Sequence, residues 1–240
     1  MSNSSHPVAI DNAHVMLLIR AIVSDDFAKV EDLIRSSPGL SRQSLAVGAT
    51  RKTASEFYFQ EINHYLISGD APLHAAAAGY RREIAKLLVK KGADVSVRNR
   101  RGAEPLHYAS DGNPGVQNWN SKKQVETIAF LISAGANPNA LDNSGVGPLH
   151  RAVRQRCSKA VDELIRRGSN VRRKNKGGST PLHLAVQNTG RGGTGSPESK
   201  ALQREIIERL INAGADPKDR DGSGRTVLQC VKSDWILALL

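Results

Sequence analysis

One short motif recurs along this chain and restricts the folds that the chain can adopt. Four copies of Pro-Leu-His begin at Pro72, Pro105, Pro148 and Pro181, and a weaker copy, Val-Leu-Gln, begins at Val227. Successive copies are 33, 43, 33 and 46 residues apart. A second marker, of the Gly-Ala-Asp type, follows each full copy, at Gly92, Gly135, Gly168 and Gly214. Recurrence at this spacing is typical of a solenoid, in which each unit buries its apolar face against its neighbours.

The residues between two copies predict two helices and a turn in every unit. Proline suits the first helical position, because its φ is preset and it has no N–H to leave unpaired. A short helix rich in small residues follows, as in 75–78, and the second helix has apolar residues at helical spacing, as in Ile84, Leu87 and Leu88. Glycine then ends the helix where a positive φ is needed. A polar stretch such as 94–103 therefore predicts a turn or hairpin that projects from the stack.

Residues 71–222 resemble the ankyrin repeat. The matching segments are Ala71-Pro-Leu-His, Ile84-Ala-Lys-Leu-Leu-Val, Gly92-Ala-Asp-Val and Thr180-Pro-Leu-His-Leu-Ala-Val. The resemblance implies an all-α solenoid of stacked helix–turn–helix units with β-turn or hairpin fingers. It further implies that the fingers and the first helices bind proteins, and that the histidine of each Pro-Leu-His is structural.

The period divides the chain into four parts. We expect residues 1–40 to be a degenerate N-terminal capping repeat with two short helices over 11–36, and residues 41–70 to be an aromatic-rich insertion. Four repeats then occupy 71–222, and a partial capping repeat occupies 223–240. Terminal units of such arrays are atypical because they cover the ends of the core.

The insertion differs from the repeats in composition. Thr53 and Glu56 have the spacing of a capping box, which predicts a short helix. Aromatic residues make up 4% of the whole chain. This segment is much richer in them, because it contains Phe57, Tyr58, Phe59 and Tyr65. Two interpretations stay open: the insertion folds back to cover the first full repeat, or it presents an aromatic platform to a partner.

Threonine, which precedes proline in the ankyrin consensus, is absent from three of the four full repeats. Ala71, Glu104 and Gly147 stand in its place. Loss of an N-cap hydroxyl typically costs about 1 kcal/mol. We therefore expect the first three repeats to depend more on packing than the fourth.

Two repeats have long segments between their helices, over 111–120 and 188–197. The second contains Arg191-Gly-Gly-Thr-Gly-Ser, which lacks the spacing of a phosphate-binding loop and follows a helix rather than a strand. We expect a flexible loop that could close over a partner.

Charge is distributed unevenly along the chain. The net charge is +11, but residues 71–240 contain 28 Lys and Arg against 15 Asp and Glu. Basic residues gather in the first and third fingers and on the first helix between them, which favours an acidic partner. The candidate partner-binding residues are Arg98, Arg100, Arg101, Trp119, Arg151, Arg154, Lys174, Lys176 and Arg191.

Several classes of function find no support in the sequence. The four histidines occupy equivalent repeat positions, so they should lie apart along the stack rather than bind a metal together. Cys157 and Cys230 have no metal-ligand spacing. No arrangement of nucleophile and base is evident, so we expect neither enzyme activity nor a cofactor. No apolar run is long enough to span a membrane and no secretory signal is present, which favours a cytoplasmic location.

The sequence therefore predicts an ankyrin-repeat scaffold or adaptor, expected to be monomeric, that recognises an acidic protein through basic fingers and the concave helix face. The alternative is nucleic-acid or polyphosphate binding through the same surface. Nucleic acid is less favoured, because no aromatic side chains accompany the fingers for base stacking. An effector that targets a host protein would use the same fold, and no residue favours it.

Overall fold

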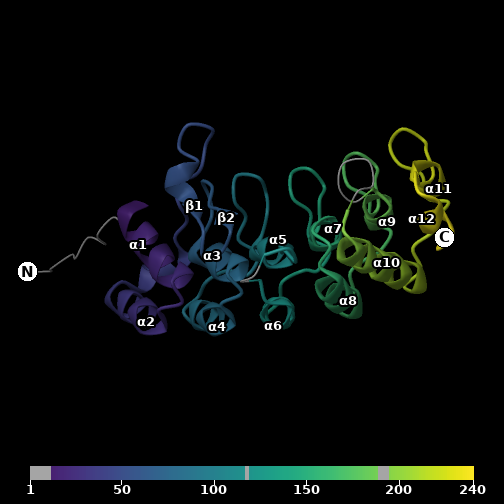
Figure 1. Cartoon of the computed structure of the whole chain (residues 1–240). Helices are drawn as coiled ribbons and strands as arrows, with labels where there is room; N and C mark the ends of the chain where they lie inside the picture. The colour runs from purple at the N-terminus through teal and green to yellow at the C-terminus, as the bar shows by residue number, and fades with distance from the viewer. Residues whose placement is uncertain (1–11, 117–118, 189–194) are drawn as a thin grey trace, which may run out of the picture.

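The computed structural model describes residues 12–116, 119–188 and 195–240. It confirms the all-α solenoid: the helices form an elongated stack of two rows, with the first helices of the units in one row and the second helices in the other (Figure 1). The first helices are α1 (Asn12–Val23), α3 (Pro72–Ala78), α5 (Pro105–Ser110), α7 (Pro148–Arg154), α9 (Pro181–Ala185) and α11 (Val227–Cys230). The second helices are α2 (Phe27–Ser36), α4 (Arg82–Lys90), α6 (Ser121–Ser133), α8 (Ser158–Arg166), α10 (Pro197–Asn212) and α12 (Asp234–Leu237). Within the described ranges, no helix combines the length and apolar character needed to cross a membrane.

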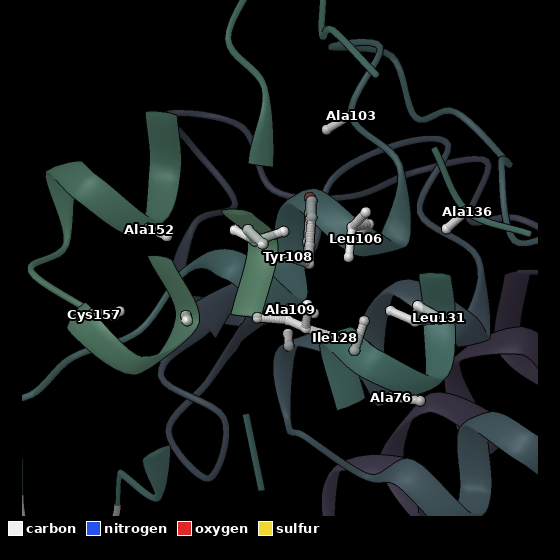
Figure 2. Packing of buried hydrophobic residues seen from close by; sticks show 14 of the residues in the cluster. Ala76, Ala103, Leu106, Tyr108, Ala109, Ile128, Leu131, Ala136, Ala152 and Cys157 are labelled. Carbon is white, nitrogen blue, oxygen red and sulfur yellow. The ribbon is translucent and has the colours of Figure 1, made fainter. Parts of the chain in front are cut away.

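A continuous aliphatic core runs through the stack. In α3, Ala75, Ala76 and Ala77 are fully buried, and their small side chains let this helix pack closely on α1 and α5. Leucines and isoleucines from the second helices, such as Ile128 and Leu131 of α6, fill the space between the two rows (Figure 2). Burial of such side chains is the main source of stability here, because each unit completes the core of its neighbours.

The repeated histidines connect each unit to the next. In all four, Nδ1 accepts a hydrogen bond from the backbone N–H that precedes the proline, at 3.1–3.2 Å. The other nitrogen, Nε2, lies 3.0–3.5 Å from a carbonyl oxygen of the following finger. Burial lowers the pKa of His107 to about 4, which keeps its ring neutral. The histidines thus serve as structural links, as the resemblance implied.

The four fingers share one turn design. Asn99, Asp142, Asn175 and Asp221 each accept backbone N–H groups of their own finger, and a glycine with positive φ follows three residues later. Backbone hydrogen bonds then join neighbouring finger tips: Asn143 donates to Arg101, Lys176 to Ser144 and Gly222 to Gly177. The fingers therefore form one connected edge along the stack rather than independent loops.

The capping-box prediction for the insertion is wrong. The Thr53 hydroxyl bonds to Thr50 instead of capping a helix. The chain forms a 3₁₀ turn, η2 (Ser55–Phe57), and then an antiparallel hairpin of β1 (Tyr58–Phe59) and β2 (His64–Tyr65). Alternate burial explains the outcome: Phe57 and Phe59 face inward while Tyr58 faces solvent, and a period of two suits a strand rather than a helix. A further 3₁₀ turn, η1 (Pro38–Arg42), leads into the insertion and includes its first two residues.

The missing threonines have unequal consequences. The Thr180 hydroxyl lies 3.5 Å from the His183 N–H, whereas Ala71, Glu104 and Gly147 make no side-chain cap. Of the three residues that stand in place of threonine, Glu104 costs the most stability. This residue is only 7% exposed, and its Oε2 has no hydrogen-bond partner within the described structure. Burial raises the pKa of this carboxyl, with the Arg98 charge opposing the shift and Asp94 adding to it.

Glu104→Gln is therefore expected to stabilise the protein at neutral pH by about 1–2 kcal/mol. A carboxyl with a raised folded-state pKa stabilises the fold below its ordinary pKa and loses that contribution as pH rises through the folded pKa. The gain over the natural protein should accordingly shrink as pH falls below about 4, where glutamate becomes protonated in the unfolded state as well. Urea unfolding at several pH values measures this difference. Glu31→Gln, at an exposed position of α2, is the control and should change the free energy of unfolding by less than about 0.5 kcal/mol.

Candidate functional site

Two adjoining hollows lie between the hairpin, the fingers and the first helices. The larger has a volume of about 700 Å³ and lies between the first two fingers and α7. Its lining includes His64, Arg100, Arg101, Asp111, Asp142, Arg151 and Arg154. The smaller, of about 410 Å³, lies between the insertion and the first finger. Because His64, Arg100, Arg101 and Arg151 line both, the two hollows form one continuous site, which we call the hairpin–finger groove.

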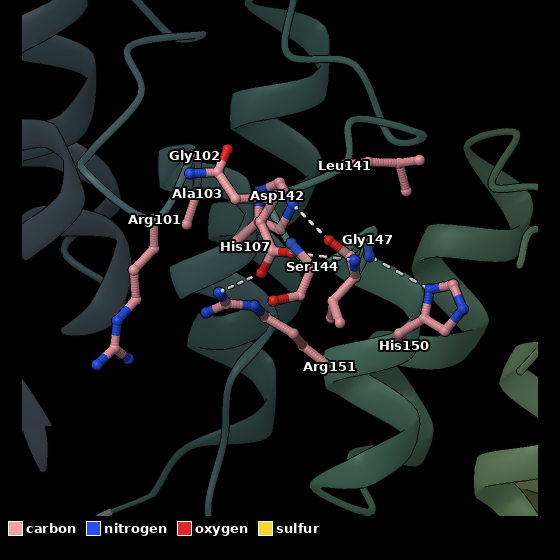
Figure 3. A network of polar contacts seen from close by, with 12 residues as sticks. Arg101, Gly102, Ala103, His107, Leu141, Asp142, Ser144, Gly147, His150 and Arg151 are labelled. Atoms are coloured by element: carbon pink, nitrogen blue, oxygen red, sulfur yellow. Dashed lines mark hydrogen bonds and ion pairs between the residues drawn. The ribbon is translucent and has the colours of Figure 1, made fainter. Parts of the chain in front are cut away.

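Arg151 is a fixed cation in this groove. Its guanidinium is held between two carboxylates, at 2.7 Å from Asp111 and 3.3 Å from Asp142, and it lies 5.8 Å from the centre of the Tyr108 ring. Figure 3 shows the contact with Asp142. Burial opposes the charge, but the two carboxylates more than compensate and raise the pKa of Arg151. Burial likewise opposes ionisation of Asp111, whose pKa is lowered overall by His64 and Arg151. The groove therefore contains an ion cluster centred on Arg151.

A buried polar network supports the groove from below. The Asp70 carboxylate is fully buried and accepts hydrogen bonds from the Ile67 N–H at 2.6 Å, the Asn99 amide at 2.8 Å and the Tyr108 hydroxyl at 2.9 Å. The His64 ring stacks on the Tyr108 ring with 4.3 Å between centroids. The insertion, the first finger and α5 are thereby locked together, which fixes the groove walls.

Two cations of the groove are uncommitted. Arg101 and Arg154 are exposed, and their guanidinium groups contact no carboxylate or hydrogen-bond acceptor in the part of the chain that the structure describes. Arg100 uses one nitrogen to donate to the Ala49 carbonyl, at 2.8 Å. The larger hollow thus combines four guanidinium groups with two carboxylates, and those carboxylates are already paired with Arg151. Its remaining charge is positive and suits an anionic group.

The structure brings some of the predicted site residues together and separates others. Arg100, Arg101, Arg151 and Arg154 meet at the larger hollow. Arg98 donates to the Gly102 and Leu141 carbonyls and so joins two fingers. The remaining predicted residues are Lys174, Lys176, Trp119 and Arg191.

Three of these four lie outside the groove, and the fourth is not among the described residues. Lys174 and Lys176 are exposed on the third finger, outside the lining of the groove. Trp119 is partly buried against the core and lines a separate hollow of about 220 Å³ with Tyr80 and Lys123. Arg191 lies outside the described residues.

Sequence reasoning missed several groove residues. His64 comes from the insertion, where the concentration of aromatic residues was a signal, although it did not identify the histidine. Asp111 and Asp142 are 40 and 9 residues from Arg151 in the chain. Only the stacking of the second and third repeats places both beside the same guanidinium, so no sequence spacing indicates this cluster.

Comparisons with known proteins agree with the repeat fold. The family model described as ankyrin repeats (3 copies) matches residues 18–119 and 116–221. Mouse ankyrin repeat and SOCS box protein 16 is 32% identical over 61% of this chain, and human transient receptor potential cation channel subfamily A member 1 is 31% identical over 67%. The Arabidopsis thaliana E3 ubiquitin-protein ligase KEG is 27% identical over 88%. The matched segments span 30%, 15% and 15% of those three proteins, respectively.

Proposed function

The chain belongs to the ankyrin-repeat family, and on this premise we propose that it is a scaffold or adaptor that binds an acidic segment of a partner protein in the hairpin–finger groove. Ankyrin repeats generally mediate protein–protein interactions. The single observation that carries the proposal is the meeting of four guanidinium groups at one hollow, two of them without a partner among the described residues. Guanidinium groups bind carboxylates through paired, charge-assisted hydrogen bonds.

The proposed scaffold role has no catalytic component. The family is typically non-catalytic, although one relative is named as an E3 ubiquitin-protein ligase. Over the ranges that the structure describes, no cluster of three or more His, Cys, Asp or Glu is arranged to hold a metal ion. The two cysteines are free thiols, and burial raises the pKa of Cys157 to about 12, so this thiol is a poor nucleophile.

Selection from a displayed library of random peptides tests the proposal. Peptides selected on the immobilised protein should be enriched in Asp and Glu. The double variant Arg101→Glu/Arg154→Glu should weaken their binding roughly tenfold or more, because two uncommitted cations become anions facing the ligand. Both arginines are exposed, and neither side chain makes a hydrogen bond or ion pair within the described structure, so the fold should persist, which circular dichroism checks.

A charge-matched control separates a local site from general attraction. Lys122→Glu/Lys159→Glu makes the same change in net charge on exposed first-turn positions of α6 and α8, where acids also suit the helix dipole. This variant should bind within about twofold of the natural protein. Equal losses in both variants, or selected peptides without excess acid, would contradict the proposal. If duplex DNA binds in an Arg101- and Arg154-dependent manner and acidic peptides do not, the nucleic-acid alternative replaces it.

A further inference from the structure

We infer that the partner segment places one aromatic or large aliphatic side chain next to its acidic residues, in the smaller hollow that the insertion forms against the first finger. The inference rests on the proposed function and concerns which segments the groove selects. The smaller hollow, of about 410 Å³, is large enough for any single side chain. Its lining includes Ala49, Ala54, Tyr65, Ile67 and the Tyr108 ring.

The walls of this hollow differ from those of its neighbour. Ala49, Ala54 and Ile67 present methyl and methylene groups, whereas the larger hollow is lined mainly by charged and polar side chains. Tyr65 stands at the edge with 48% of its surface exposed. An exposed ring beside an apolar hollow is the arrangement in which protein interfaces gain most from an anchoring side chain.

The position of the hollow couples it to acid recognition. Arg100 and Arg101 lie on the border that it shares with the basic hollow, and Arg100 donates to the Ala49 carbonyl in the wall itself. A side chain that enters the hollow therefore brings the neighbouring residues of the same segment to guanidinium groups. An apolar residue flanked by acids satisfies both hollows, while a purely acidic segment leaves the smaller one filled only by water.

The hairpin is anchored firmly enough to keep this hollow open before a partner arrives. Phe57 and Phe59 are buried, and Ile62 lies against Gly79, where a Cβ would approach its methyl to 2.7 Å. Backbone hydrogen bonds run from the Leu66 N–H to the Phe57 carbonyl and from the Ala49 N–H to the Leu66 carbonyl. A preformed hollow spares the partner the cost of ordering the site. The insertion is thus a cover for the first repeat on one side and a wall of the binding groove on the other.

Synthetic peptides with matched sequences test the inference. Each fluorescein-labelled peptide has about twelve residues of Glu, Ser and Gly, with Trp, Leu or Ala at the centre, and a parallel set has Gln in place of Glu. Fluorescence anisotropy gives the Kd of each. The Trp and Leu peptides should bind the natural protein at least fivefold more tightly than the Ala peptide, and the Gln set should bind weakly throughout.

Variants of the chain identify the hollow. Tyr65→Ala should reduce the preference for the Trp peptide over the Ala peptide to less than about twofold. Ala54→Trp, which fills the hollow, should reduce this preference in the same way. The Ala54→Trp variant should still bind the Glu-containing peptide that has Ala at its centre. Tyr58→Ala is the matched control: Tyr58 is the other exposed tyrosine of the hairpin, its ring is 4.8 Å from that of Tyr65, and it lines neither hollow. The Tyr58→Ala variant should prefer the Trp peptide to the same extent as the natural protein does.

The possible results separate the two proposals. If Trp, Leu and Ala peptides bind equally and all depend on Glu, the inference is overturned while the proposed function stands. If the preference for the Trp peptide persists in both the Tyr65→Ala and the Ala54→Trp variants, the apolar side chain does not bind in the smaller hollow and the inference is overturned. If no Glu peptide binds more tightly than its Gln counterpart, the proposed function fails, and the inference fails with it.

Discussion

Replacement of Asp70, which lies beneath the hairpin–finger groove, by alanine is expected to lower the free energy of unfolding by about 3–5 kcal/mol. Three donors, the Ile67 N–H, the Asn99 amide and the Tyr108 hydroxyl, would lose a fully buried charged acceptor. Each buried donor left unpaired costs about 1–3 kcal/mol, and entry of water would recover part of this. Urea unfolding measures the loss.

The consequence for function follows from the same contacts. Tyr108 supports the stacked His64 ring and lies beneath Arg151, so loss of its hydroxyl partner should loosen the walls of the hairpin–finger groove. Hydrogen exchange should accelerate first in the insertion and the first finger, because stability in a repeat array is shared mainly between neighbouring units. Binding of acidic peptides should weaken in parallel.

Two further variants make this prediction discriminating. Asp70→Asn preserves the shape but replaces one acceptor oxygen with a donor, so it should give an intermediate loss. Asp32→Ala removes a carboxylate whose ion pair with Arg35 is fully at the surface, and it should change stability by less than about 1 kcal/mol. A loss of less than 1 kcal/mol for Asp70→Ala would show that the network contributes little to the fold.

Gly178→Ala is expected to destabilise the C-terminal part of the stack by about 3–4 kcal/mol. Gly178 has φ of +74°, and a Cβ there would lie 2.2 Å from the backbone nitrogen of Gly222 in the next finger. Alanine at positive φ alone costs about 1–2 kcal/mol. The clash is between two backbones, so neither can rotate away, and the fingers must separate and break the hydrogen bond from the Gly222 N–H to the Gly177 carbonyl.

Gly168→Ala separates these two costs. Gly168 also has positive φ, +89°, but a Cβ there would meet nothing within 4 Å. It should therefore show only the conformational cost of about 1–2 kcal/mol. Urea unfolding, with hydrogen exchange over 216–230, measures both variants. Equal losses would mean that the contact between the third and fourth fingers contributes nothing to stability.

The sequence predicted the repeat architecture well because its signals are local. Proline at a helix start, apolar spacing along a second helix and glycine at a helix end each act within one or two turns, and their recurrence defined the units. The same counting predicted the two long interhelical segments: α6 begins directly after the first, at Ser121, and α10 begins at Pro197, the last residue of the second. The basic character of the first finger and of α7 was also visible in the chain.

The groove itself was not visible, because it depends on contacts between units. Arg151 gains Asp111 and Asp142 as partners only when neighbouring repeats stack, and Tyr108 gains His64 only when the insertion folds back. The sequence therefore determined the solenoid and the sign of its charge. Tertiary structure alone decided which arginines are paired and which stay available, since the pairing joins residues that no local spacing relates. It also decided that the insertion is a hairpin, because the burial of alternate aromatic side chains outweighed a local helix signal.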